Sequence, residues 1–171
     1  MKRALWALAA TLALTTACTA SVASTASTGT PAGSWRGNGV EVTLRWAAGS
    51  PAGPVLAAEF LPTQPGFHLY SVDLPDGGLD GVGRPTKVDV GGALSAVGPA
   101  SADVPVVALR VVGLADPLPV YPDGRVTVRQ VVRVNAARGA EVFLTYAACS
   151  RTACLPPVSR QRVDVSLPPG S

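Results

Sequence analysis

Two cysteines near the carboxyl end of the chain, Cys149 and Cys154, have the residue type and the spacing for thiol–disulfide chemistry. Four residues separate them, so a bond between them would close a very small ring. Such a ring constrains the unfolded chain by only about 2 kcal/mol, whereas a ring of about 100 residues would give nearly 5 kcal/mol. A small ring is a poor staple, but it can hold two sulfurs together whether they are bonded or free. The spacing therefore favours a redox pair, with a structural staple as the main alternative.

A metal site is the third interpretation of the two thiols. Two thiolates would need two further ligands, and His68 is the only imidazole in the chain. The single methionine is Met1, so a methionine copper site is not available either. We therefore expect neither a metal nor another cofactor.

Disulfide exchange needs a reachable, partly ionised sulfur that attacks a partner's disulfide and a second thiol that resolves the mixed disulfide. Arg151, inside the ring, and Arg160, shortly after it, could each lower a thiol pKa by charge proximity. Either could equally be a solvated surface side chain. Pro156 and the proline after it stiffen the exit from the ring, or simply end a strand.

Three side chains with an imidazole or phenol group, elsewhere in the sequence, could support the cysteines. His68 could tune a cysteine pKa or relay a proton, although a lone histidine on a strand is more often structural. Tyr70 and Tyr146 lie on predicted strands that could meet, and each could equally be a core residue. These three positions are the supporting candidates that the residue types themselves suggest.

The elements that must position these side chains are short strands. Residues 125–134 alternate most clearly, with valines at 126, 128, 132 and 134 on one face. Further strands are expected at 40–46, 55–61, 67–73, 86–90, 104–112, 141–147 and 161–167. Glycines and prolines punctuate these runs, and no window of about 11 residues carries a helical stripe. We predict an all-β fold, specifically an immunoglobulin-like antiparallel β-sandwich.

The amino terminus has the pattern of a bacterial export signal. Lys2 and Arg3 precede an apolar stretch at 4–13 that is too short to span a bilayer as a mature helix. Residues 14–18 resemble a lipobox, which predicts a signal peptide at 1–17 and lipidation of Cys18. The alternative is ordinary signal cleavage, for example after Ala23. Both alternatives predict a protein outside the cytoplasm, where disulfides persist.

Length and charge limit the remaining possibilities. Residues 18–35 are rich in Ser, Thr, Ala and Gly and predict a flexible tether, which leaves one domain at 36–171. The net charge is +3, and without Lys2 and Arg3 the chain has 12 basic and 11 acidic side chains. No basic run is present, so we expect no nucleic-acid partner.

The segment around the cysteines resembles the amino-terminal periplasmic domain of the thiol–disulfide interchange protein DsbD and related single-domain disulfide bond corrector proteins. The motif is Tyr-x-x-Cys-x4-Cys-Leu-Pro-Pro-Val at 146–158. Residues 66–71, 81–86 and 119–121 also resemble stretches of that family. The resemblance covers roughly 38–168.

The resemblance implies an immunoglobulin-like domain that takes electrons from a membrane-embedded thiol reductase and passes them to thioredoxin-fold proteins outside the cytoplasm. It implies that Cys154 is the attacking thiol and Cys149 its partner. It places aromatic side chains from the strand of Phe67 and Tyr70 near the disulfide, under a cap loop within 76–84. The donor is then expected to be a separate membrane protein, which the lipid tether at Cys18 keeps close. Cytochrome c maturation, rescue of misoxidised proteins and peroxide defence are all open as downstream roles.

A second function, from another class, fits the same sequence. The chain could be a lipid-anchored β-sandwich that binds other proteins, with a purely structural disulfide. The reduction potential separates the two hypotheses, because structural disulfides usually lie below about −300 mV.

Overall fold

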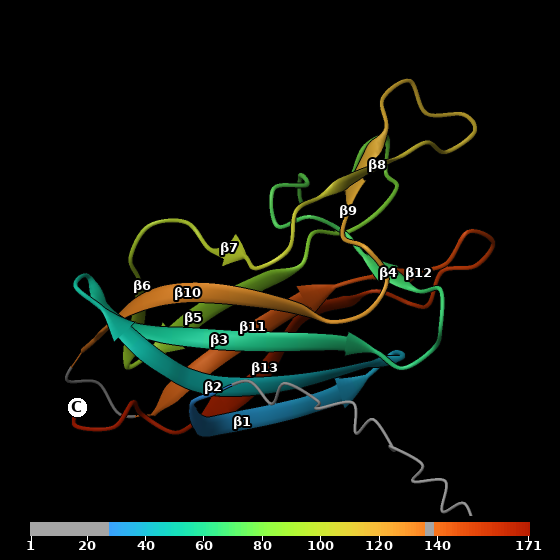
Figure 1. Cartoon of the computed structure of the whole chain (residues 1–171). Helices are drawn as coiled ribbons and strands as arrows, with labels where there is room; N and C mark the ends of the chain where they lie inside the picture. The colour runs from blue at the N-terminus through green and yellow to red at the C-terminus, as the bar shows by residue number, and fades with distance from the viewer. Residues whose placement is uncertain (1–27, 136–138) are drawn as a thin grey trace, which may run out of the picture.

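The computed structural model describes residues 28–135 and 139–171, and every regular element in these ranges is a β-strand (Figure 1). The all-β prediction is therefore confirmed. These ranges accordingly contain no helix that could cross a bilayer. The predicted signal peptide at 1–17 and the predicted lipidation site, Cys18, lie outside the described residues.

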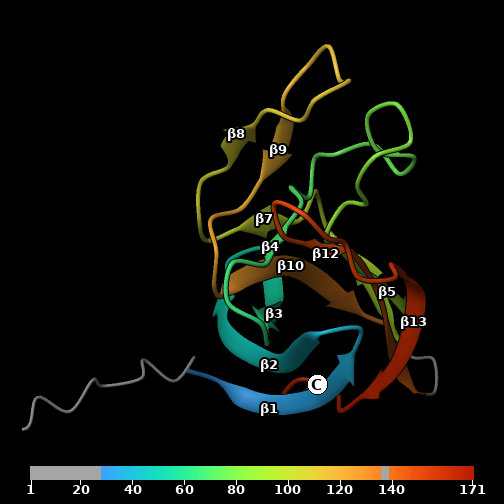
Figure 2. The ribbon, with the colours of Figure 1, turned by 90° about the vertical axis from the view of Figure 1, so that its right-hand side faces the viewer.

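Two antiparallel sheets form the body of the domain. The larger sheet has the strand order β1-β2-β3-β10-β6, and β7 also pairs with β10. Its strands are β1 (Thr30–Gly37), β2 (Val40–Ser50), β3 (Gly53–Pro62), β10 (Val126–Val134), β6 (Leu94–Ala96) and β7 (Ser101–Ala102). The smaller sheet has the order β13-β11-β5, formed by β13 (Val158–Val165), β11 (Ala140–Tyr146) and β5 (Lys87–Gly92). Figure 2, seen nearly along the strands, shows the two sheets curving around a common interior.

Alternating side chains explain why the two sheets pack face to face. Along β2, buried residues alternate with partly exposed ones, and the pattern repeats in β11. An edge-to-face contact between Phe60 of β3 and Tyr146 of β11, with ring centroids 5.8 Å apart, joins the two sheets through the core. Period-two alternation is what a sheet with one buried face requires.

The first strand begins earlier than the sequence predicted. Thr30 already pairs with Trp46 of β2, although it falls within the segment assigned to the tether, 18–35. Ala32 is buried, and its carbonyl accepts a hydrogen bond from the Ser166 backbone at 3.0 Å. Backbone pairing does not need apolar side chains, so a strand rich in small polar residues carries no alternation signal.

Two short strand pairs lie at one end of the sandwich and build the site. They are β4 (His68–Leu69) with β12 (Ala148–Cys149), and β8 (Val107–Leu109) with β9 (Leu118–Val120). The β8–β9 hairpin projects away from the sandwich beside β4 and β12 (Figures 1 and 2). The predicted strands 67–73 and 104–112 are thus much shorter than expected. After Tyr70 the chain turns, because the Ser71 carbonyl accepts a hydrogen bond from the Leu74 backbone.

Candidate functional site

A disulfide joins Cys149 to Cys154 across a tight hairpin. The two Cα atoms are 4.0 Å apart, and the residues form an antiparallel bridge. One backbone hydrogen bond lies on each side of this pair: Ser150 N–H donates to the Ala153 carbonyl at 2.7 Å, and Leu155 N–H donates to the Ala148 carbonyl at 2.9 Å. The backbone therefore holds the two cysteines side by side independently of the bond between the sulfurs.

The turn between the cysteines is also closed by a side chain. Ser150 Oγ accepts hydrogen bonds from the backbone N–H groups of Ala153 at 3.0 Å and Thr152 at 3.3 Å. A serine hydroxyl at the start of a turn commonly satisfies backbone donors in this way. The residues inside the ring thus form an ordered turn.

The exit from the hairpin rests on the turn between β1 and β2. Asn38 and Gly39 have positive φ values of 45° and 72°, which suits a two-residue hairpin turn. Asn38 Nδ2 donates a hydrogen bond to the Pro156 carbonyl at 2.8 Å. A Cβ at Gly39 would overlap the Leu155 side chain, so glycine allows the two segments to approach. Pro156 itself is exposed, and only its carbonyl takes part in this contact.

The two cysteines differ in exposure. Cys149 is 3% exposed, whereas Cys154 is exposed to solvent. A thiolate from another protein can therefore approach Cys154 much more readily than Cys149. An external reagent would therefore reach the sulfur of Cys154 first.

A groove of about 560 Å³ runs beside the disulfide. The β8–β9 hairpin and the loop that follows β8 form one wall, and the cysteine hairpin forms another. Its lining comprises His68, Tyr70, Val82, Leu109, Arg110, Val111, Val112, Leu118 and residues 149–154. The lining includes two arginines, Arg110 and Arg151, and no carboxylate. Val112 is fully exposed, so the groove offers both an apolar edge and positive charge.

His68 is the cross-strand partner of Cys149. The two residues lie directly opposite each other in the β4–β12 pair. His68 is 6% exposed, and its Nε2 atom has no hydrogen-bond partner. Burial lowers the pKa of His68 below its ordinary value, and it outweighs the charge of Asp123, which acts in the opposite direction. The imidazole is therefore neutral at pH 7.

Tyr70 supports the imidazole from the same side of β4. Its ring contacts the His68 ring edge to face, with centroids 5.7 Å apart. Burial raises the pKa of the Tyr70 phenol, which is therefore protonated at neutral pH. A Cβ at Gly83 would lie 2.8 Å from the Tyr70 ring, so the loop at 76–84 packs directly on it. This loop, in which a cap was expected, contributes Val82 to the groove and leaves Cys154 exposed.

Two of the predicted supporting residues lie in the core instead of the groove. Tyr146 is fully buried; its hydroxyl donates to the Gly37 carbonyl at 2.7 Å and accepts from Trp35 Nε1 at 3.1 Å. Phe67 belongs to the same core cluster. Alternation along the strand turns Phe67 to the opposite side from His68. Neither ring lines the groove.

The two arginines singled out from the sequence have separate positions. Arg151 lines the groove, as described above. Arg160 lies elsewhere: its guanidinium is 3.7 Å from Asp89 and 4.7 Å from the centroid of the Phe143 ring. Arg110, which does line the groove, was missed, because nothing in its neighbourhood in the sequence connects it to the cysteines.

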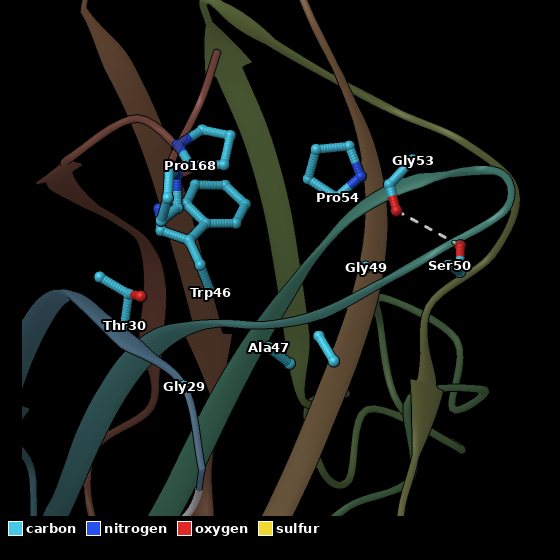
Figure 3. Close-up of a pocket in the computed structure, with 11 residues that line it drawn as sticks. Gly29, Thr30, Trp46, Ala47, Gly49, Ser50, Gly53, Pro54 and Pro168 are labelled. Atoms are coloured by element: carbon cyan, nitrogen blue, oxygen red, sulfur yellow. Dashed lines mark hydrogen bonds between the residues drawn. The ribbon is translucent and has the colours of Figure 1, made fainter.

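A second cavity, of about 630 Å³, carries no comparable chemistry. Trp46, Pro54 and Pro168 line it together with residues 47–50 (Figure 3). Trp46 is held by a hydrogen bond from Nε1 to the Ser166 carbonyl at 2.9 Å. The lining contains neither an ionisable side chain nor a thiol. We therefore place the candidate site at the disulfide.

In the described ranges, no three His, Cys, Asp or Glu side chains are grouped so that they could hold a metal ion. Comparison with known proteins adds no assignment: the chain matches no family model and no curated protein. The geometry of the disulfide and its groove is therefore the basis for a functional proposal.

Proposed function

We propose that this chain is an extracytoplasmic thiol–disulfide exchange protein that works through Cys149 and Cys154. It would take electrons from a membrane thiol reductase and pass them to thioredoxin-fold partners, as the resemblance to DsbD implies. A lipid at Cys18 would anchor it to a bacterial membrane, facing the periplasm or the cell surface. One observation carries the proposal: a backbone hairpin holds an exposed cysteine beside a buried one at the edge of an open groove.

The proposed reaction begins on the oxidised protein. A donor thiolate attacks Cys154 Sγ, the bond to Cys149 breaks, and its electron pair leaves on Cys149 Sγ, which takes up a proton. A second thiol of the donor then attacks the mixed disulfide and releases Cys154 as a thiolate. The donor dithiol is oxidised to a disulfide, and the protein is reduced by two electrons. Attack by the Cys154 thiolate on an acceptor disulfide, followed by resolution through Cys149, returns the protein to its oxidised form.

Trapping experiments on the two single-cysteine variants test the proposal. Reduced Cys149→Ser protein, which keeps the exposed thiol, should form a mixed disulfide with an oxidised thioredoxin-fold protein. Reduced Cys154→Ser protein is the matched control and should form little or none, because its remaining thiol is buried. Wild-type reduced protein should transfer electrons to the same partner without a lasting adduct.

The opposite result supports the binding-module hypothesis. If neither variant forms an adduct and the wild-type pair has a reduction potential below about −300 mV, the disulfide is structural. Differential alkylation of protein taken directly from cells adds a second readout, since an exchange protein should be found partly in the dithiol form.

A further inference from the structure

The buried imidazole of His68 has no assigned role in the exchange reaction described above. Its Nε2 atom is the one buried side-chain nitrogen or oxygen in the described ranges that lacks a hydrogen-bond partner. Buried polar groups are nearly always satisfied, so such an atom requires an explanation. One explanation is that the hydrogen-bond partner of Nε2 exists only when the disulfide is reduced.

The register of the strands places Cys149 within reach of this nitrogen. His68 and Cys149 are directly opposite in an antiparallel pair, which puts their Cβ atoms on one face of the pair and about 4.5–5.5 Å apart. Both side chains line the groove, and the edge-to-face contact with Tyr70 orients the imidazole. The Cys149 sulfur in the disulfide carries no proton. In the dithiol it carries an S–H group, from which Nε2 can accept a hydrogen bond.

We infer that His68 is the acid–base residue of Cys149, with Nε2 exchanging a proton with its sulfur. The inference rests on the proposed function. In resolution, Nε2 takes the proton from the Cys149 thiol, and the resulting thiolate attacks Cys154 Sγ in the mixed disulfide. The new disulfide forms, the partner leaves as a thiolate with the electron pair, and the imidazolium returns its proton to solvent. In ring opening, the departing Cys149 thiolate takes up a proton from solvent, and the resulting thiol donates its S–H to Nε2.

The other charged and titratable groups around His68 leave it as the proton acceptor. Tyr70 lies against the ring with a phenol that stays protonated at neutral pH. Asp123 acts on His68 only through its charge, and Arg110 and Arg151 line the groove as permanent cations. Burial favours the neutral imidazole at pH 7, and in its Nδ1–H tautomer Nε2 is the atom that accepts a proton.

A two-step reaction with a chromogenic aromatic disulfide separates the two cysteines. In reduced wild-type protein, Cys154 attacks first and releases one equivalent of coloured thiolate, and Cys149 then releases the second equivalent as the ring closes. His68→Gln should leave the first step unchanged and slow the second at pH 7 by about a hundredfold, the lower end of what general acid–base catalysis contributes. The second step of the variant should also rise with pH toward the ordinary thiol pKa of about 8.5 or beyond.

Equal second-step rates and pH profiles in the wild type and His68→Gln would overturn the inference while leaving the proposed function intact. Absence of the second step in wild-type protein would instead contradict the proposed function. A measurement that keeps His68 covers the case in which the variant does not fold. In wild-type protein, the second-step rate should rise with pH only through the titration of His68, which burial places below about pH 6.5, and level off above it. A second-step rate that still rises toward about pH 8.5 would also overturn the inference.

Discussion

Asn38 and Pro156 lie 118 positions apart in the chain and are joined by a 2.8 Å hydrogen bond from the Asn38 side-chain amide to the Pro156 carbonyl. Through this bond the turn between β1 and β2 supports the segment that leaves the cysteine hairpin. Gly39 adds a close contact with Leu155 in the same place. The hairpin is thus attached to the larger sheet at its exit as well as to β4 at its entry.

Removal of the Asn38 amide should loosen the exit without disturbing the turn. Asn38→Gly keeps a residue that tolerates positive φ but lacks the donor. Because the bond is exposed, we expect a loss of at most about 1 kcal/mol in the free energy of unfolding. Urea denaturation measures this loss, and amide hydrogen exchange at Leu155 should become faster. Unchanged exchange at Leu155 would show that the contact does not hold the hairpin.

Tyr146→Phe should reduce stability without changing the redox reaction. The substitution leaves Trp35 Nε1 and the Gly37 carbonyl without the Tyr146 hydroxyl, which should cost about 1–3 kcal/mol. The rate of disulfide exchange should stay at the wild-type value, because the ring lies in the core. A changed exchange rate in a folded variant would instead return Tyr146 to the reactive site.

Replacement of both cysteines by alanine should cost little stability. The ring is small, so the loop-entropy relation gives about 2 kcal/mol for loss of the covalent constraint. The flanking backbone hydrogen bonds remain available in the variant. Comparison of urea denaturation for Cys149→Ala/Cys154→Ala and for reduced wild type separates the loss of the bond from the loss of the side chains. A loss well above 5 kcal/mol would identify the disulfide as a structural staple.

The two groove arginines should favour anionic partners. Reduction of the disulfide by a small thiol that carries a carboxylate should be several-fold slower in Arg110→Gln/Arg151→Gln than in wild type, and reduction by an amine-bearing thiol should be faster. Both effects should diminish in high salt. Arg160→Gln is the matched control, because that side chain pairs with Asp89 outside the groove. If all three substitutions change the reduction rates equally, the effect comes from the net charge of the protein and not from the groove.

His68 should make the protein sensitive to mild acid. Its pKa is lowered in the folded state from the ordinary 6.5, chiefly by burial. Below about pH 6.5 the unfolded chain binds a proton that the folded protein does not, so stability falls as the pH falls and levels off below the folded-state pKa. His68→Gln should flatten this dependence. Urea denaturation at pH 7.5 and 5.5 tests it, and parallel losses in both proteins would contradict it.

The fold class was predictable because its signal is local. Alternation at Val126, Val128 and Val132 predicts a half-buried strand, and all three side chains are fully buried. β1 was missed because only Ala32 of its side chains is buried. The immunoglobulin-like topology stays a prediction, as does the exchange function.

The site was predictable only in part. The spacing of the cysteines indicated their pairing, but His68 and Cys149 meet through a register between distant segments that no local pattern encodes. The same holds for Arg110, which reaches the groove from the loop after β8. Tyr146 was left open between a core role and a supporting role, and the structure places its ring in the core.

The hydrogen bonds on either side of Cys149 and Cys154 have one more consequence. Because they belong to the main chain, we expect electron uptake to leave the contour of the hairpin almost unaltered. A docking protein would then meet nearly the same outline before and after transfer. Shape complementarity alone therefore cannot determine the direction of electron transfer. The relative reduction potentials of the donor and the acceptor must determine it.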